Sequence, residues 1–177
     1  AAIKKQVEIP KLIEAVRVVL KTDMTVGCFM VIGFPEDDRQ SMKESVRFIR
    51  KLAWLGVHDI TVSQFTPYPG SKYYSELLAA GVLKQSNEEF GAVMDFYSNK
   101  ETTYCESLNS KQLYRWMLYM YVNFYGLSFV LRPHRVIANL FRYLTGGVEN
   151  TRYTRLFAEL FFKRKGWKVK SALNSFQ

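Results

Sequence analysis

The stretch CFMVIGFPEDD, residues 28–38, decides the fold. Its apolar residues do not alternate with polar ones but run on to Gly33, as in a strand that is buried on both faces of a parallel sheet. Pro35 then turns the chain, and three acids follow at 36–38. Because Asp37 or Asp38 is a suitable N-cap, the stretch predicts a strand over 25–34 that leads directly into a helix.

The segments on either side extend this pattern. A helix is predicted over 8–22, with Pro10 in its first turn. After the central helix, which Gly56 ends, a loosely alternating strand over 57–65 stops at TPYPGS, residues 66–71. Ser71 can cap a further helix over 72–80 that Gly81 ends. The order helix, strand, helix, strand, helix predicts an α/β fold with a right-handed parallel crossover. The expected buried face of the central helix is Met42, Val46, Ile49, Leu52 and Ala53.

The second half of the chain reads as helical, so we expect a domain over 1–90 and a basic, aromatic-rich helical region over 91–177. Two parallel strands cannot bury both of their faces alone, and we expect the open sheet edge to be covered by another copy, in a homo-oligomer, or by the chain's own helices. Three apolar helical faces are predicted: Leu113, Trp116, Met117, Met120 and Phe124; Val136, Ile137, Leu140, Phe141 and Leu144; and Leu156, Phe157, Leu160 and Phe161.

The net charge of +9 is concentrated in the second half. Residues 1–90 carry 12 basic and 11 acidic side chains, an excess of one, whereas residues 91–177 carry 13 and 5, an excess of eight. Such a region indicates nucleic acid, an anionic membrane surface or an acidic neighbour, and the plainer alternative is a solvated face. Since no RNA-binding motif is recognisable, nucleic acid is the least favoured of these partners.

Several features bear on the compartment. The longest uncharged run, residues 116–131, has 16 residues, whereas a transmembrane helix needs about 20. No secretory signal is visible, and Cys28 and Cys105 are too far apart in sequence to indicate a disulfide framework, a zinc site or an iron–sulfur site. We therefore expect a cytoplasmic protein, with peripheral membrane contact as an alternative.

Ligands of parallel α/β folds bind at the carboxyl ends of the strands, which are IGFPE (32–36) and QFTPYPG (64–70). At the first, Gly33 offers a bare backbone, and the acids after it would repel a phosphate, so a purine, ribose hydroxyls or a cationic group fits better. At the second, Thr66, Tyr68 and the carbonyls before the prolines can accept hydrogen bonds from an exocyclic amine. The alternative at both ends is a purely structural turn. His58 and His134 lack partners at metal or catalytic spacing, so no catalytic or metal residue is assigned.

Two motifs carry a family resemblance. FMVIGFPEDD (29–38), followed about 30 residues later by FTPYPGSKYYSELLAAGVL (65–83), resembles the carboxyl half of the radical S-adenosylmethionine barrel. The similarity covers roughly residues 8–85 and is greatest to the cobalamin-binding subgroup of Fe-S oxidoreductases, which includes magnesium-protoporphyrin monomethyl ester cyclase. It implies strands five and six of a partial, TIM-like βα barrel, followed by a mainly α-helical region.

The resemblance also implies binding residues. Val31 and Gly33 correspond to positions that pack against the adenine of S-adenosylmethionine, and Phe65, Thr66 and Tyr68 to positions at its edge. Glu36 stands where the family has glycine, so the acid of the family motif aligns with either Glu36 or Asp37.

The CxxxCxxC loop of that family is absent from the sequence. The resemblance therefore implies a fragment, inactive alone and with no cofactor bound, of a radical S-adenosylmethionine oxidoreductase, cyclase or methyltransferase. Its full-length form would hold S-adenosylmethionine and a [4Fe-4S] cluster, with cobalamin as a further candidate. The expected partners are the missing N-terminal barrel half and an unidentified substrate. The alternative is a non-catalytic module whose basic helices dock on RNA or an anionic membrane surface.

Overall fold

The computed structural model describes residues 8–83 and 103–144. The chain divides into two compact units, 1–128 and 129–177. The domain boundary expected near residue 90 and the helical face expected at 156–161 lie outside the described residues, and both stay predictions. In the second unit, helix α6 (Pro133–Leu144) is formed as expected, with Ile137 and Phe141 exposed on its surface.

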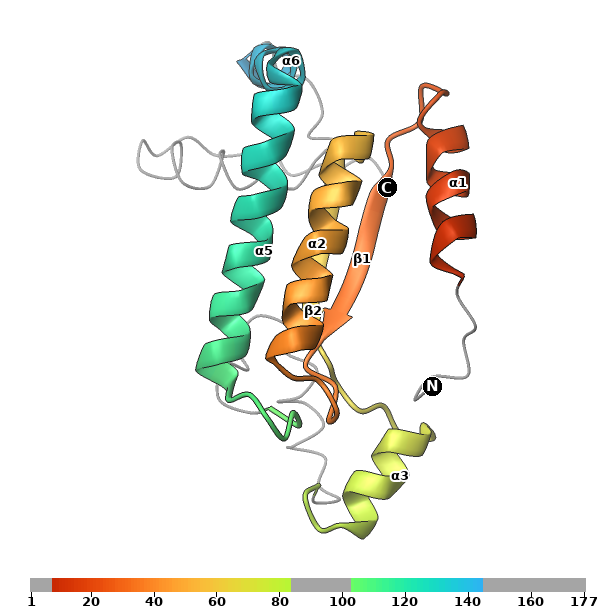
Figure 1. Cartoon of the computed structure of the whole chain (residues 1–177), viewed down its shortest axis with the longest axis vertical. Helices are drawn as coiled ribbons and strands as arrows, with labels where there is room; N and C mark the ends of the chain where they lie inside the picture. Colours follow the sequence, from red (N-terminus) through yellow and green to blue (C-terminus); the bar gives the residue numbers. More distant parts are fainter. Residues whose placement is uncertain (1–7, 84–102, 145–177) are drawn as a thin grey trace, which may run out of the picture. The chain divides into compact units, whose positions relative to one another are not determined.

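The first unit is built around a strand–helix–strand motif (Figure 1). Strands β1 (Gly27–Ile32) and β2 (Asp59–Gln64) are parallel, in a register that pairs the two first residues and the two last residues with each other. Helix α2 (Arg39–Leu55) makes the crossover, α1 (Ile9–Val19) precedes β1, and α3 (Lys72–Ala79) follows β2. This confirms a mixed α/β fold with a small parallel sheet, and within the described residues the sheet has two strands, so the barrel itself stays a proposal.

Helix α2 begins and ends at the residues that the sequence indicates. The Asp38 carboxylate accepts a hydrogen bond from the Ser41 amide at 2.8 Å, and the Ser41 hydroxyl accepts one from the Asp38 amide at 3.5 Å, which forms a capping box. Gly56 ends the helix with a left-handed φ of 103°. All five residues of the expected apolar face are buried: Met42, Val46, Ile49, Leu52 and Ala53.

Helix α5 (Ser110–Leu131) packs onto this motif, although it lies far from the motif in sequence. Leu113, Met120 and Phe124 are fully buried and belong to the same core cluster as Ile32 of β1 and the buried face of α2. Burial of one such side chain contributes about 1.5–3 kcal/mol. Helix α5, which belongs to the helical region predicted over 91–177, is therefore part of the core that supports the sheet.

Helix α5 also covers the edge of β2 that faces away from β1. The Tyr121 hydroxyl accepts a hydrogen bond from the Val62 amide at 2.9 Å and donates one to the Val62 carbonyl at 3.2 Å. Beside it, the Asp59 carboxylate accepts hydrogen bonds from the Ile60 amide, at 2.9 Å, and from the Tyr125 hydroxyl. Side chains thus take the hydrogen-bonding groups that an added strand would use.

The face of β1 that carries Phe29 and Val31 is exposed. These side chains are 82% and 45% accessible, whereas Ile32, on the opposite face, is 1% accessible. The Ile32 carbonyl accepts from the Phe65 amide at 2.7 Å, so the alternate residues Phe29 and Val31 direct their backbone groups to the edge away from β2. We call Phe29, Val31 and this backbone edge the β1 strip.

His58 has a structural role in the first unit. Its Nδ1 accepts a hydrogen bond from the Val26 amide at 3.1 Å, while its own amide donates to the Val26 carbonyl at 2.9 Å. Across 8–83 and 103–144, no helix is long and apolar enough to cross a membrane.

Candidate functional site

The carboxyl ends of β1 and β2 lie at the same edge of the sheet, because the strands are parallel and Ile32 pairs with Gln64 (Figure 1). Two loops leave this edge, one running to α2 and one to α3. All the binding residues predicted from the sequence belong to these loops or to the strand ends. Their surroundings therefore decide what the site can hold.

The loop after β1 is closed by its own acid. The Asp37 carboxylate accepts hydrogen bonds from the Gly33 amide at 2.8 Å and from the Phe34 amide at 3.0 Å. The Asp37 amide in turn donates to the Phe34 carbonyl at 3.0 Å. Asp38 caps α2. The hydrogen bonds that its carboxylate accepts, first from the Ser41 amide and then from the Ser41 hydroxyl, hold the pKa of the Asp38 carboxyl below its usual value. Asp37 and Asp38 are therefore engaged in shaping the turn and starting the helix.

Gly33 is held against α5. Its φ is +83°, and a Cβ atom at this position would lie 2.8 Å from Cδ1 of Leu113. Glycine is needed here for both backbone conformation and close packing. The structure thus gives Gly33 a structural reason to lack a side chain, independent of the ligand contact that the family resemblance implies.

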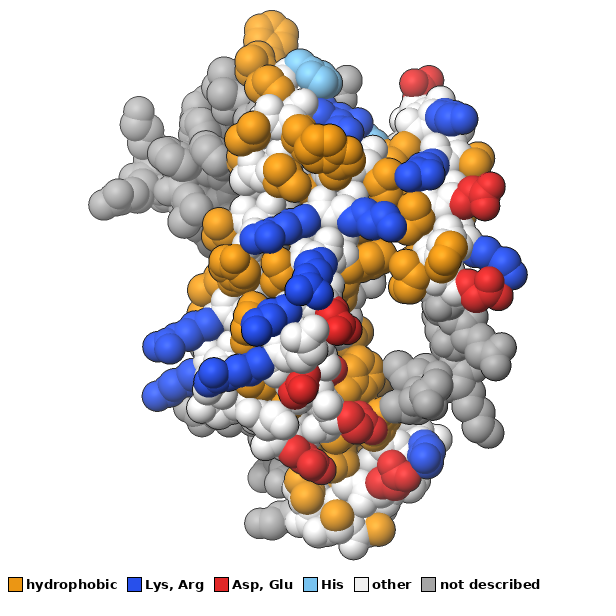
Figure 2. All heavy atoms as spheres, in the orientation of Figure 1, with side chains coloured by type: hydrophobic (Ala, Val, Ile, Leu, Met, Phe, Trp, Pro, Cys, Tyr) orange, Lys and Arg blue, Asp and Glu red, His pale blue; other side chains and the backbone are white. Residues whose placement is uncertain are grey.

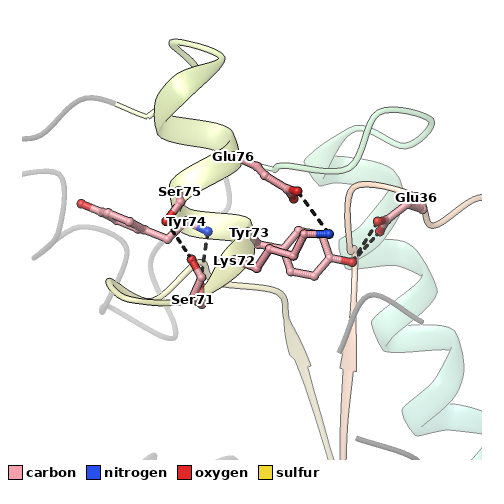
Figure 3. Close-up of polar contacts among 7 residues, drawn as sticks. All are labelled: Glu36, Ser71, Lys72, Tyr73, Tyr74, Ser75 and Glu76. Carbon is pink, nitrogen blue, oxygen red and sulfur yellow. Dashed lines mark hydrogen bonds and ion pairs between the residues drawn. The ribbon is translucent and has the colours of Figure 1, made fainter. Parts of the chain in front are cut away.

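Glu36 joins the two loops. The Tyr73 hydroxyl, on α3, donates to the Glu36 carboxylate and lies 2.9 Å from each of its oxygens (Figure 3). Burial of Tyr73, followed by this hydrogen bond and the negative charge of Glu36, raises the pKa of Tyr73 to about 12. Glu36 therefore ties α3 to the loop after β1.

The N-terminus of α3 is stabilised by local contacts. The Ser71 hydroxyl caps the helix by accepting from the Tyr74 amide at 3.2 Å (Figure 3). The same hydroxyl donates to the Tyr68 carbonyl at 2.7 Å. Lys72 and Glu76 form an ion pair at 3.3 Å on the exposed face. Tyr68, with half of its surface accessible, lies in the loop that this cap fixes.

An aromatic cluster fills the space between the strand ends. Phe65 lies 4.6 Å from Phe34, 5.1 Å from Tyr73 and 6.4 Å from Tyr104 between ring centroids. Phe34 and Tyr73 are 5.9 Å apart. Such tilted and edge-on pairs contribute about 0.5–1.5 kcal/mol each beyond their burial. The cluster makes this edge of the sheet a largely apolar platform.

The segment before α5 packs on the loop after β1. The Cys105 thiol donates to the Asp37 carbonyl at 3.0 Å, and the Glu106 amide donates to the Pro35 carbonyl at 3.1 Å. Cys105 is buried. This segment carries no pattern that would have indicated the contact from sequence.

The structure separates the six predicted binding residues into groups. Glu36 and Phe65 are brought together through Tyr73, whereas Val31 lies on the exposed β1 strip. Gly33 faces α5, half-buried Thr66 follows Phe65, and Tyr68 is exposed farther along the loop. Their ligand contacts stay predictions. Sequence reasoning missed Tyr73, whose only signal was an aromatic residue in the first turn of a helix that follows a strand end.

Metal ligands do not gather at this site. Within the described part of the chain, no group of three or more His, Cys, Asp or Glu side chains is placed to hold a metal ion. Both cysteines are free, and burial raises the pKa of the Cys28 thiol.

Comparison with known proteins gives one informative similarity. The chain is 26% identical, over 134 residues, to a protein of Pyrococcus horikoshii named as an uncharacterized methyltransferase. This chain resembles part of a methyltransferase. The match covers 74% of the chain but 26% of the relative, so the chain spans about a quarter of that protein's length. No protein-family model and no solved structure matches the chain.

Proposed function

We propose that this chain is part of an enzyme of methyltransferase type that uses S-adenosylmethionine, and that the ends of β1 and β2 form one wall of the nucleoside site. The similarity to a methyltransferase over 134 residues carries this proposal. The strand ends support it, because they offer an apolar platform and loop carbonyls at the edge where parallel α/β folds bind nucleotides.

The finer form of the proposal is a radical S-adenosylmethionine enzyme, in which β1 and β2 are the last two strands of a partial barrel. The two sequence motifs and their parallel strand–helix–strand arrangement support it. The outer edge of β2, covered by Tyr121, is what a last strand needs. The exposed β1 strip would then receive the preceding strand from the N-terminal half of the same protein.

The residues present fit the two cofactors differently. Val31 could pack against an adenine ring, and the carbonyls of the loop after β2 could accept hydrogen bonds from its amine. Bound S-adenosylmethionine would supply the activated methyl group. An iron–sulfur cluster does not fit, because it is held by cysteine thiolates, the sequence has two, and Cys105 is buried on the Asp37 carbonyl. Cluster and cobalamin binding would belong to the rest of the enzyme, for which we propose a cytoplasmic location.

The test uses the protein from the whole reading frame and measures S-adenosylmethionine binding by titration calorimetry. Val31→Asp places a charge on the β1 strip, and we expect at least a tenfold loss of affinity if the ring packs there. Val18→Asp, at a 60% accessible position of α1, is the matched control. Equal affinities for Val31→Asp and the unaltered protein would overturn the assignment of this wall, and absence of binding by the unaltered protein would overturn the proposed cofactor.

A further inference from the structure

A groove between α2 and α5 collects cations on a face separate from the strand ends. Its volume is about 820 Å³, and it opens to solvent. Five basic side chains line it, four from α2 and one from α5: Arg39, Lys43, Arg47, Arg50 and Arg115. Figure 2 shows Lys and Arg side chains gathered over these two helices.

The cations of α2 form a row. Residues 39, 43, 47 and 50 follow one another at intervals of one helical turn, so the row extends over about 16 Å at 1.5 Å per residue. Like charges four residues apart destabilise a helix, and Arg39 and Lys43 lie near the N-terminus, where the helix dipole favours acids instead. The row therefore opposes the stability of α2, which points to a role outside folding.

Among the described residues, no carboxylate forms an ion pair with the row. In the described ranges the ion pairs are Lys11–Glu8 and Lys72–Glu76, and neither includes a cation of the groove. Glu44 of α2 accepts a hydrogen bond from Gln40 at 3.0 Å. Arg50 donates to the Asn123 side-chain oxygen at 2.8 Å and to the Tyr119 hydroxyl at 3.3 Å, and both of these acceptors are neutral groups.

Aromatic side chains line the opposite wall. Trp116 and Tyr119 of α5 both border the groove, with their rings edge to face at 5.9 Å between centroids. Trp116 is half-buried and Tyr119 is 47% accessible. A row of cations beside accessible aromatic side chains is the arrangement by which proteins bind single strands, with phosphates on the cations and bases stacked on the rings. A membrane would instead need apolar groups that protrude, whereas here the surface is concave.

We propose that this groove binds single-stranded nucleic acid, with the backbone along the α2 row and bases against Trp116 and Tyr119. The inference is independent of the proposed enzymatic function. Total charge did not reveal the site, because four of its five cations come from the nearly neutral half of the chain. The geometry of the groove therefore favours nucleic acid, which the sequence made the least favoured partner because no RNA-binding motif is recognisable.

The first experiment measures binding of a fluorescein-labelled single-stranded RNA of about 12 nucleotides to the whole 177-residue chain by anisotropy, over a range of salt concentrations. Contact with three or four phosphates predicts that log K falls against log salt with a slope of about −2 to −3. The double variant Arg47→Glu/Arg115→Glu should bind at least tenfold more weakly. The matched control, Arg17→Glu/Lys21→Glu on and beside α1, makes the same charge change away from the groove and should bind within twofold of the unaltered chain.

A second readout reports the stacking. The sequence has three tryptophans, so Trp54→Phe/Trp167→Phe leaves Trp116 as the fluorophore. We expect RNA to quench its emission, and Trp116→Leu to weaken binding by about 5- to 150-fold, as loss of one stacked base does. Circular dichroism and urea unfolding establish that each variant is folded.

Three results would overturn the proposal. Equal losses in the groove and control variants would show that net charge alone attracts RNA. Competition by polyglutamate as strong as that by unlabelled RNA of equal charge would show a site for acidic chains in general. Retention on phosphatidylserine vesicles, with no RNA binding by the folded chain, would assign the cations to a membrane surface.

Discussion

The hydroxyl of Tyr73 in α3 lies 2.9 Å from both carboxylate oxygens of Glu36, in the loop after β1. This contact joins the two loops that leave the carboxyl ends of the strands. It also explains a departure of the sequence from the family that it resembles, in which glycine stands at this position. A glutamate in its place adds a fixed acceptor for a buried phenol.

Removal of this hydrogen bond should lower stability by a measurable amount. In Tyr73→Phe the ring stays in its aromatic cluster, while the exposed Glu36 regains water, so we expect a loss of about 1 kcal/mol in the free energy of unfolding. Urea unfolding measures it. The matched control is Tyr74→Phe, whose ring points away from Glu36 in Figure 3 and which should change stability by less than about 0.5 kcal/mol. Equal losses in both variants would contradict the assignment.

The same contact predicts a loss of stability at high pH. The folded chain keeps Tyr73 protonated to about pH 12, whereas an unfolded tyrosine ionises near pH 10. Its contribution is therefore complete below about pH 10 and is lost as the pH rises from 10 to 12. Because lysines and other tyrosines also titrate there, the quantity to measure is the difference between the unaltered chain and Tyr73→Phe. A difference that does not change from pH 9 to 11.5 would rule out the raised pKa.

Gly33 and Gly70 offer a matched pair that separates packing from backbone strain. Both have positive φ, +83° and +85°, but a Cβ atom at Gly33 would lie 2.8 Å from Cδ1 of Leu113, whereas a Cβ atom at Gly70 would meet no non-neighbouring heavy atom within 4 Å in the described residues. We expect Gly70→Ala to cost about 1–2 kcal/mol and Gly33→Ala about 2–5 kcal/mol, measured by urea unfolding. If the two costs are the same, Leu113 moves aside freely, and the positive φ alone accounts for glycine at 33.

The Tyr121 hydroxyl should protect the edge of β2. In Tyr121→Phe the buried Val62 loses a partner for both its amide and its carbonyl, with an expected loss of about 1–3 kcal/mol in the free energy of unfolding. Hydrogen exchange of the Val62 amide should accelerate in parallel. Tyr119→Phe removes a hydroxyl that contacts exposed Arg50, and it should lower stability by less than about 0.5 kcal/mol. Unchanged exchange at Val62 would show that other contacts hold this edge.

The elements of the sheet region could be predicted because their signals are local. The unbroken apolar run predicted β1 over 25–34, where the structure has Gly27–Ile32, and the loosely alternating segment 57–65 contains Asp59–Gln64. The caps at Asp38, Gly56 and Ser71 are where side-chain and backbone chemistry placed them. Such features depend on residues within one or two turns of each other.

The contacts of the site were not predictable for the opposite reason. Tyr121 and Val62 are separated by 59 residues, and Tyr73 and Glu36 by 37. Periodicity identified the buried face of α5 but not the surface that it covers, since an apolar stripe fits any apolar partner. Gly33, Thr66 and Tyr68 were also indicated by their places at the strand ends, whereas Val31 and Phe65 came from the family resemblance alone. The ligand contacts of all six binding residues stay predictions. The groove was missed because its cations come from two helices whose juxtaposition depends on these long-range contacts.

The edge of β2 is covered by side chains, whereas the edge of β1 is exposed, and this difference limits how the described unit can pair with further strands. With Tyr121 and Asp59 occupying the outer side of β2, strand pairing can proceed in one direction, at β1. Two copies could meet β1 to β1 and would then present only blocked edges, so the pairing ends at a dimer. A sheet of indefinite length, as in amyloid growth, needs two open strand edges on each molecule. The described unit has one open edge, so its strands cannot pair in this way while it is folded.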